Sequence, residues 1–163
     1  GAGVETATAQ DADTASTEVQ LQDPMQVDAE RIFARIEAGI AFAQQHNSRR
    51  IVLLGHGSGA YWATRYMAER QPAHVQKLVL VDTRTPDTAP QQIDELAALL
   101  KVATTDVFYS DRQAAADAAQ RRLQASKRQK GAVYSQVSLK SLPDKAAQAE
   151  QLFRRVKGAL NAQ

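Results

Sequence analysis

The stretch Ile51-Val-Leu-Leu-Gly-His-Gly-Ser-Gly-Ala60 decides the fold. It begins with an uninterrupted apolar run, Ile51 to Leu54, and continues into a cluster of glycines. Strands of a parallel sheet, covered on both faces, have such continuous aliphatic runs. Glycines permit a tight turn and a close approach of two backbones. The stretch therefore predicts a strand buried on both faces, followed by a turn and a helix from Ala60 to Arg70.

The rest of the chain alternates between helical and strand patterns on both sides of this stretch. Apolar residues at helical spacing predict a helix from Asp28 to His46 before it. The patterns after it predict strands at Val75–Val81, Asp106–Tyr109 and Val133–Leu139, and helices at Gln91–Leu100, 111–129 and beyond the capping segment Ser141–Asp144. Four strands separated by helices predict an α/β fold, a three-layer sandwich with a mostly parallel sheet and about five helices.

Length and composition limit the class of protein. The chain has 163 residues and is 44% apolar, which suits one modest globular domain. It has no cysteine, so disulfides, thiolate metal sites and cysteine nucleophiles are excluded. No apolar run approaches the length of a membrane span, so none is predicted. The opening Gly1-Ala-Gly is neither a signal peptide nor a natural start, which suggests a trimmed chain.

Charge and apolar content divide the chain into two parts. Residues 1–27 have no aromatic residue and few large aliphatic ones, so we expect a flexible acidic leader or inserted linker, followed by one domain at 28–163. Acids predominate in residues 1–47 and bases in residues 48–163. Such a basic surface attracts polyanions or membranes, but a merely solvated face is the simpler interpretation. Nucleic-acid binding is not expected, because the cations at 121–130 lack interleaved aromatics.

The glycine cluster resembles a nucleophile elbow, G-x-S-x-G, in which the middle residue carries the reactive hydroxyl. Gly55 and Gly59 match the flanking glycines, and Gly57 takes the middle position, where it cannot attack a carbonyl. A frame shifted by one residue makes Ser58 the nucleophile of an atypical serine hydrolase or esterase, but places His56 where a side chain crowds the turn. We expect the Ser58 hydroxyl instead to satisfy a backbone N–H in the first turn of the helix.

The same letters also match a dinucleotide-binding fingerprint. Gly55, Gly57 and Ala60 fit G-x-G-x-x-A, and Asp82 follows the next strand, where an acid would bind a ribose. A Rossmann-like unit would hold a pyrophosphate at the helix N-terminus. Such fingerprints usually open a domain, whereas a complete helix precedes this one.

Several segments resemble the α/β-hydrolase superfamily and, more specifically, an uncharacterised proteobacterial branch of hydrolase-like proteins, a domain of unknown function. They are Ile51 to Ala60, Leu78-Val-Leu-Val-Asp82, Asp106-Val-Phe-Tyr109, Tyr134-Ser-Gln-Val137 and Arg154-Arg-Val-Lys-Gly-Ala-Leu160. The resemblance covers residues 28–160 and implies a partial hydrolase fold, its C-terminal half. It also suggests an exported, periplasmic bacterial protein, with the leader as a variable insertion.

The resemblance implies a catalytic acid near Asp111 and a catalytic histidine after the last strand. No histidine follows Leu139, so two of three triad positions lack the required residue. Asp111 has the alternative role of a helix N-terminal residue. Among the three histidines, His56 occupies an elbow position where packing is its expected role, and their spacing predicts no metal site. Tyr61, Trp62 and Tyr66 are expected in the core.

We therefore predict a non-catalytic α/β-hydrolase-like domain with a binding or scaffolding role. The candidate ligand-binding residues, for a small anionic group at the helix N-terminus, are Gly55, His56, Gly57, Ser58 and Gly59. No cofactor is predicted, and an open sheet edge would favour self-association or an unknown protein partner. Were the chain an enzyme, ester or amide hydrolysis would be its reaction, with Ser58 and Asp111 as weak candidates.

Overall fold

The computed structural model describes residues 24–87, 89 and 92–162. In chain order its elements are α3 (Pro24–Gln45), β1 (Ile51–His56), α4 (Ser58–Arg70), β2 (Val75–Val81), α5 (Ile93–Ala97), β3 (Ala103–Tyr109), α6 (Gln113–Ser126), β4 (Tyr134–Leu139) and α7 (Lys145–Asn161). The predicted alternation is confirmed, with boundaries that differ by a few residues. Residues 1–23 of the expected leader lie outside the described part, and residues 24–27 already belong to α3.

By its internal contacts the chain forms two compact units. The first comprises residues 1–49 and 88–90, whose described helix is α3; the second comprises residues 50–87 and 91–163. All four strands and the helices from α4 onward belong to the second unit. The glycine turn and the other candidate site residues lie in this unit too.

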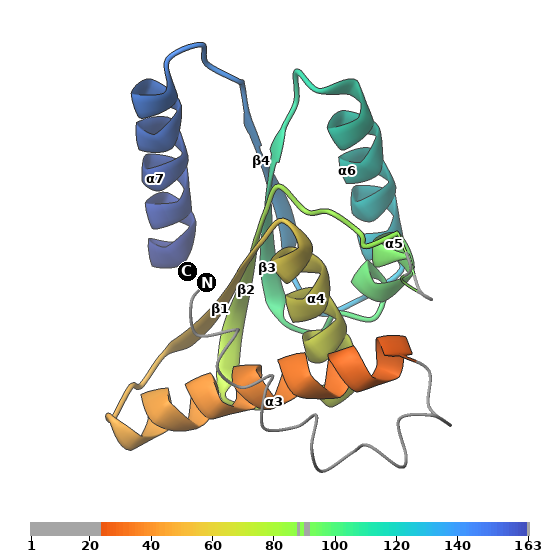
Figure 1. The fold of residues 1–163 in the computed structure, drawn as a ribbon, viewed down its shortest axis with the longest axis vertical. Helices are drawn as coiled ribbons and strands as arrows, with labels where there is room; N and C mark the ends of the chain where they lie inside the picture. Colours follow the sequence, from red (N-terminus) through yellow and green to blue (C-terminus); the bar gives the residue numbers. More distant parts are fainter. Residues whose placement is uncertain (1–23, 88, 90–91, 163) are drawn as a thin grey trace. The chain divides into compact units, whose positions relative to one another are not determined.

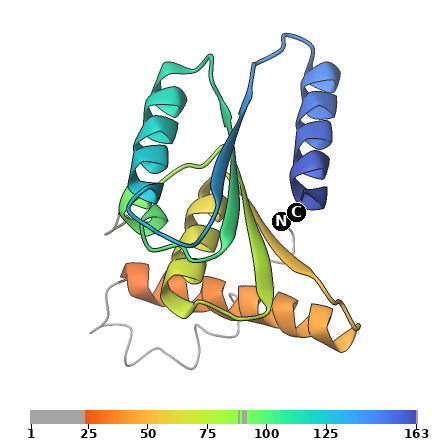
Figure 2. The ribbon, with the colours of Figure 1, turned by 180° about the vertical axis from the view of Figure 1, so that it is seen from behind.

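The four strands form one parallel sheet in the order β1-β2-β3-β4. Each crossover moves the chain one strand further in the same direction, so the crossover helices share one face of the sheet. On that face α5 contacts both α4 and α6, and α7 covers the opposite face over β2, β3 and β4 (Figures 1 and 2). The predicted α/β sandwich with a parallel sheet is confirmed.

The core beneath α7 is aliphatic, with one buried cation at its margin. Buried residues of β2, β3 and β4 meet Ala159 of α7 there. Lys77 of β2 is 6% exposed and donates from Nζ to the carbonyls of Ala159 and Ala162, the latter at 3.1 Å. Burial, and then the charge of Arg50, lower the pKa of Lys77. The C-terminal carbonyls of α7 thus gain donors that the helix itself cannot supply.

Strand β1 departs from the prediction of burial on both faces. Leu54 is 44% exposed, and the strand is only half-buried along most of its length. The physical reason is its position at the sheet edge, where α7 packs over β2–β4 and the strand pairs with β2 alone among the described residues. The fully covered strand is β2, in which Leu78 to Val81 are at most 2% exposed.

On the opposite face, a buried ionic network ties α6 to β3 and β4. Arg122 of α6 is 2% exposed and donates two hydrogen bonds, of 2.7 and 3.1 Å, to the carboxylate of Asp106 in β3. Tyr134 and Gln136 of β4 also donate to this carboxylate. Burial opposes the Arg122 charge, but its bonds to Asp106 outweigh that effect and raise its pKa. Burial and the adjacent Asp106 charge raise the pKa of Tyr134 as well.

The network predicts a strong asymmetry between single and double variants. Arg122→Met leaves a buried carboxylate without its counter-charge, so it should lower the free energy of unfolding by about 3–5 kcal/mol. Asp106→Asn combined with Arg122→Met should lower it less, because no buried charge remains unpaired. Urea unfolding measures both. A single variant as stable as the parent, or a double variant less stable than the single, would contradict this account.

Candidate functional site

The strand–turn–helix unit is tighter than the sequence suggests. Strand β1 continues through His56, and α4 begins at Ser58, so the turn consists of Gly57 alone. Gly57 adopts φ 62° and ψ −126°, a conformation that strains any residue with a Cβ. A Cβ built on Gly57 would nevertheless meet no atom within 4 Å. The middle position of the elbow is therefore sterically open and carries no functional group.

The two flanking glycines of the elbow differ in their structural roles. A Cβ on Gly55 would lie 2.6 Å from both Ala60 Cα and the Gly59 carbonyl oxygen, and 2.8 Å from the Ala60 nitrogen. All three are backbone atoms, which cannot move aside without shifting the start of α4. Gly59 has open space at its Cβ position. The expected role of preventing clashes thus belongs to Gly55 and not to Gly59.

This difference gives a matched pair of variants. Gly55→Ala should destabilise the fold by about 1–3 kcal/mol, because the new methyl group overlaps the α4 backbone. Gly59→Ala should stabilise it by roughly 0.4–1 kcal/mol, since alanine fits a helix and reduces the freedom of the unfolded chain. Thermal and urea unfolding test both variants. Equal effects of the two substitutions would exclude the proposed close approach.

Ser58 and His56 do not take the roles expected for them. The Ser58 hydroxyl makes no hydrogen bond within the described residues, and the N-terminus of α4 has no side-chain cap. The prediction that Ser58 satisfies a backbone N–H is therefore wrong, because the residue is in the first turn of the helix instead of preceding it. His56 is exposed, so it does not pack in the core.

Hydrogen bonds to the end of β2 and to the loop after it fix the Gly57 turn. Gly57 donates its N–H to the Val81 carbonyl at 2.9 Å, and its own carbonyl accepts from Arg84 N at 3.1 Å. Asp82, between them, adopts a positive φ of 47°, which is rare for a residue with a side chain. Its carboxylate lies 3.5 Å from the Arg84 guanidinium and 3.8 Å from that of Arg112.

These contacts bear on the dinucleotide hypothesis. The Asp82 carboxylate, which that hypothesis assigns to a ribose, pairs with two arginines. In addition, the described strands succeed one another in a single direction from β1 to β4. Dinucleotides bind where the strand order reverses, and the described sheet has no such reversal.

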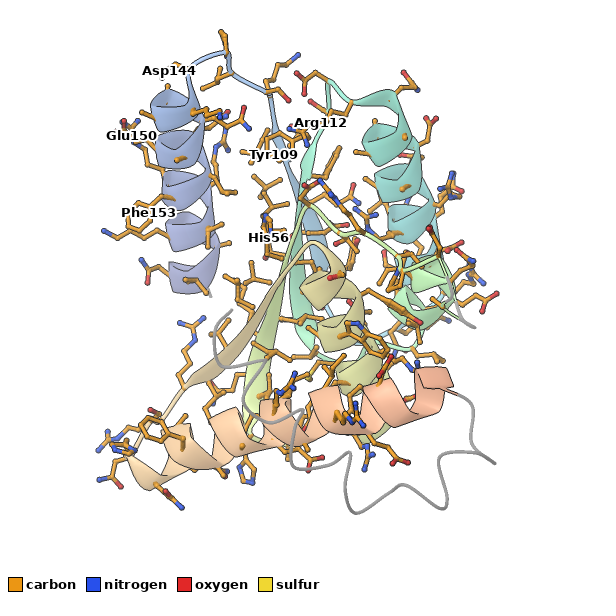
Figure 3. All side chains as sticks on the ribbon, viewed as in Figure 1. His56, Tyr109, Arg112, Asp144, Glu150 and Phe153 are labelled. Atoms are coloured by element: carbon orange, nitrogen blue, oxygen red, sulfur yellow. The ribbon has the colours of Figure 1, made fainter. Side chains whose placement is uncertain are left out.

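Asp111, the predicted catalytic acid, accepts several hydrogen bonds from a single residue, Ser141. It precedes α6 and accepts hydrogen bonds from the Ser141 backbone N–H, at 3.0 and 3.1 Å, and from its hydroxyl at 3.3 Å. The Ser141 N–H is the main cause of the lowered pKa of Asp111. Arg112 Nε donates to the Ser141 hydroxyl at 3.1 Å. The Arg112 guanidinium lies 4.1 Å from the Tyr109 ring centroid, at the end of the sheet above His56 (Figure 3).

Ser141 is therefore a site residue that the sequence interpretation passed over. It lies two residues beyond β4, where the resemblance calls for a histidine, and Asp111 binds it from the loop after β3. A search for histidine alone gave no signal at this position. The available signal is the hydroxyl residue in the loop that follows the last strand.

The lowered pKa of Asp111 predicts a pH-dependent contribution to stability. A carboxyl whose pKa is depressed by folding stabilises the fold above its ordinary pKa, and this contribution is lost as the pH falls through the lowered value. The stability difference between the parent and Asp111→Asn should consequently be largest at neutral pH and shrink in acid. Unfolding curves across this range measure it. A difference that stays constant or grows in acid would refute the assignment.

The aromatic residues of α4 follow the prediction in part. Tyr61 and Tyr66 are buried, at 0% and 3% exposure. Trp62 is only half-buried and stacks on Tyr61, with the Arg65 guanidinium 5.5 Å from its ring centroid.

The described residues contain no group of side chains suited to hold a metal ion. Nor does any helix in that part of the chain have the length and apolarity to cross a membrane.

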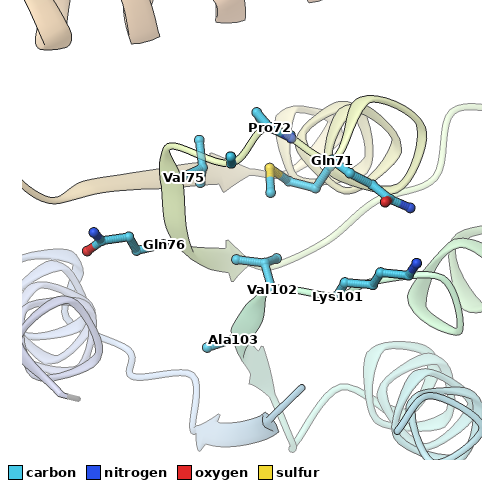
Figure 4. A pocket seen from close by; sticks show the side chains of 9 residues that line it. Gln71, Pro72, Val75, Gln76, Lys101, Val102 and Ala103 are labelled. Carbon is cyan, nitrogen blue, oxygen red and sulfur yellow. The ribbon is translucent and has the colours of Figure 1, made fainter. Parts of the chain in front are cut away.

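A cavity of about 330 Å³ lies at the other end of the sheet, where β2 and β3 begin. The C-terminal end of α4, the loop after it and the segment Lys101–Ala103 form its walls (Figure 4). Gly57 and Asp111 lie instead at the carboxyl ends of the strands. The cavity is thus separate from the candidate site.

The fold is that of the α/β-hydrolases. It matches a crystal structure assigned as a dienelactone hydrolase from Klebsiella pneumoniae, with a TM-score of 0.61 and 12% identity, over 82% of this chain and 62% of that one. It also matches an esterase from Pyrococcus furiosus, with a TM-score of 0.59 and 13% identity, over 77% of this chain and 59% of that one. The chain thus spans about three fifths of each structure.

The chain belongs to a family of proteins of unknown function, DUF3530, whose profile matches residues 2–162. No curated protein sequence matches it significantly. The expectation of an α/β-hydrolase relative is confirmed at the level of the fold.

Proposed function

We propose that this chain is a non-catalytic α/β-hydrolase-like domain that acts by binding. The observation that carries the proposal is Gly57. It has the backbone conformation of a strained turn between a strand and a helix, with open space where a side chain would stand, and it has no side chain. A nucleophile elbow places its hydroxyl at this position. Without that hydroxyl, the covalent acyl-enzyme route has no attacking atom.

The contact between Asp111 and Ser141 supports the same conclusion. In a triad the acid orients the base, which takes the proton of the nucleophile. Here Asp111 occupies the loop after β3 and accepts from Ser141, two residues beyond β4, but a serine is no base at neutral pH. Arg112 donates to the same hydroxyl and adds a fixed positive charge. The positions of acid and base keep their contact, while the base itself is missing.

Labelling with a serine-reactive fluorophosphonate tests the proposal. The exposed Ser58 hydroxyl is the alternative nucleophile, and it has no described hydrogen-bond partner to activate it. The chain should remain unmodified by intact mass, and Ser58→Ala should behave identically. A stoichiometric adduct mapped to Ser58, and lost in Ser58→Ala, would contradict the proposal and favour an ester or amide hydrolase with a shifted elbow.

The edge of β1 supports a role in protein binding. Among the described residues only β2 pairs with this strand, and an edge that is not protected accepts a strand from another chain. Its sequence, Ile51 to His56, contains neither proline nor lysine, the residues that usually block such edges. The partner predicted for the isolated chain is a second copy.

Self-association should depend on the edge strand. The weight-average mass in sedimentation equilibrium should rise with protein concentration, and Leu54→Lys, which adds charge to an exposed edge position, should abolish the rise. Leu142→Lys, at an exposed leucine remote from β1, is the matched control. A mass equal to the monomer at every concentration would remove the self-association role.

A further inference from the structure

We infer that the amino end of the sheet is a docking surface for an anionic lipid membrane. This surface is distinct from the glycine turn, which lies at the carboxyl ends of the strands, and it does not depend on the proposed function. It is built by the connections α5–β3 and α6–β4. We call it the amino-edge patch and define it by six exposed residues: Leu99, Lys101, Lys127, Arg128, Lys130 and Val133.

The sheet brings the two connections together. Strands β3 and β4 are neighbours, with Thr104 opposite Tyr134, and Thr104 N donates to the Val133 carbonyl at 2.9 Å. A small crevice between the connections is lined from both sides, by Leu100 and Val102 on one and by Gln129 and Val133 on the other. The two segments therefore lie side by side at the end where β3 and β4 begin (Figure 2).

Charge on this surface has one sign. The connections 98–102 and 127–133 contain four cations and no acid, and the neighbouring connection 71–74, between α4 and β2, has no acid either. None of Lys101, Lys127, Arg128 and Lys130 belongs to an ion pair within the described residues. The acids nearest along the chain are Asp94 and Glu95, in the first turn of α5, and Asp106, which is buried and bound by Arg122. The cations are thus available to an external anion.

Two large aliphatic side chains of the same two connections are exposed. Val133 is 71% exposed and Leu99 is 51% exposed, whereas the neighbouring Leu96 and Leu100 are buried. Exposed aliphatics surrounded by cations suit a lipid interface, in which the cations meet anionic headgroups and the aliphatics enter the acyl boundary. Aromatic platforms, on which single-stranded nucleic acids stack, are absent from these two connections. The combination favours a lipid surface over a nucleic acid.

Co-sedimentation with vesicles tests this inference on the complete chain. Binding is expected to vesicles of equal parts phosphatidylglycerol and phosphatidylcholine at low salt, and not to phosphatidylcholine alone. Each cation near an anionic surface contributes roughly fivefold in partition coefficient, so K127Q/R128Q/K130Q should bind about a hundredfold more weakly. The matched control, K140Q/K145Q/K157Q, removes the same charge from exposed positions after β4 and on α7, and should bind as the parent does.

The contribution of Leu99 and Val133 to binding distinguishes an anionic membrane from soluble polyanions. L99S/V133S should weaken vesicle binding severalfold while leaving retention on immobilised heparin unchanged. Three results would overturn the inference: no binding to phosphatidylglycerol vesicles, an equal loss in the control variant, or heparin and RNA binding without vesicle binding. Circular dichroism of each variant establishes that the fold is retained.

Discussion

The close approach of β1 to the first turn of α4 is the constraint on which the site depends. At Gly55 the two backbones leave no room for a Cβ, because Ala60 Cα would lie 2.6 Å away. This contact places Gly57 at the tip of a one-residue turn, and the Val81 carbonyl and Arg84 N–H fix its backbone from the neighbouring strand. The geometry that an elbow requires is therefore present. In the proposed function the chemistry is absent, because a glycine occupies the position that would carry it.

Buried charge is used in this molecule to join elements, and each buried charge has partners. Asp106 and Arg122 fix α6 against β3 and β4, while Lys77 supplies donors to the last carbonyls of α7. Both groups lie away from the carboxyl ends of the strands. At that end the ionisable groups are more exposed. Arg112 lies near the Asp82 carboxylate and donates to the Ser141 hydroxyl, which in turn donates to Asp111. The site thus retains a polar network built from Asp82, Asp111, Arg112 and the Ser141 hydroxyl.

The sequence predicted the class of fold and the order of elements because hydrophobic runs and glycines directly constrain the local backbone. It could not show that β1 is an edge strand, since the aliphatic run Ile51 to Leu54 is the same whether or not a helix covers it. The sequence also did not show that the Ser58 hydroxyl makes no hydrogen bond. The helix begins at Ser58 itself, so Gly57 is the N-cap residue and Ser58 is not. The Asp111–Ser141 contact joins residues 30 positions apart, and no local pattern encodes such a pairing. The hydrogen bonds of Asp106 to Arg122, Tyr134 and Gln136 could not be predicted for the same reason.

In the proposed function the elbow and the acid are in place, and a nucleophile and a base are missing. Hydrolysis of an activated ester by Gly57→Ser/Ser141→His, compared with each single variant and with the unmodified chain, tests this most directly. The double variant, once shown to be folded, is expected to turn over the ester faster than either single variant and to be labelled by a fluorophosphonate. A folded double variant no more active than the singles would show that positions 57, 111 and 141 do not form the remains of a triad.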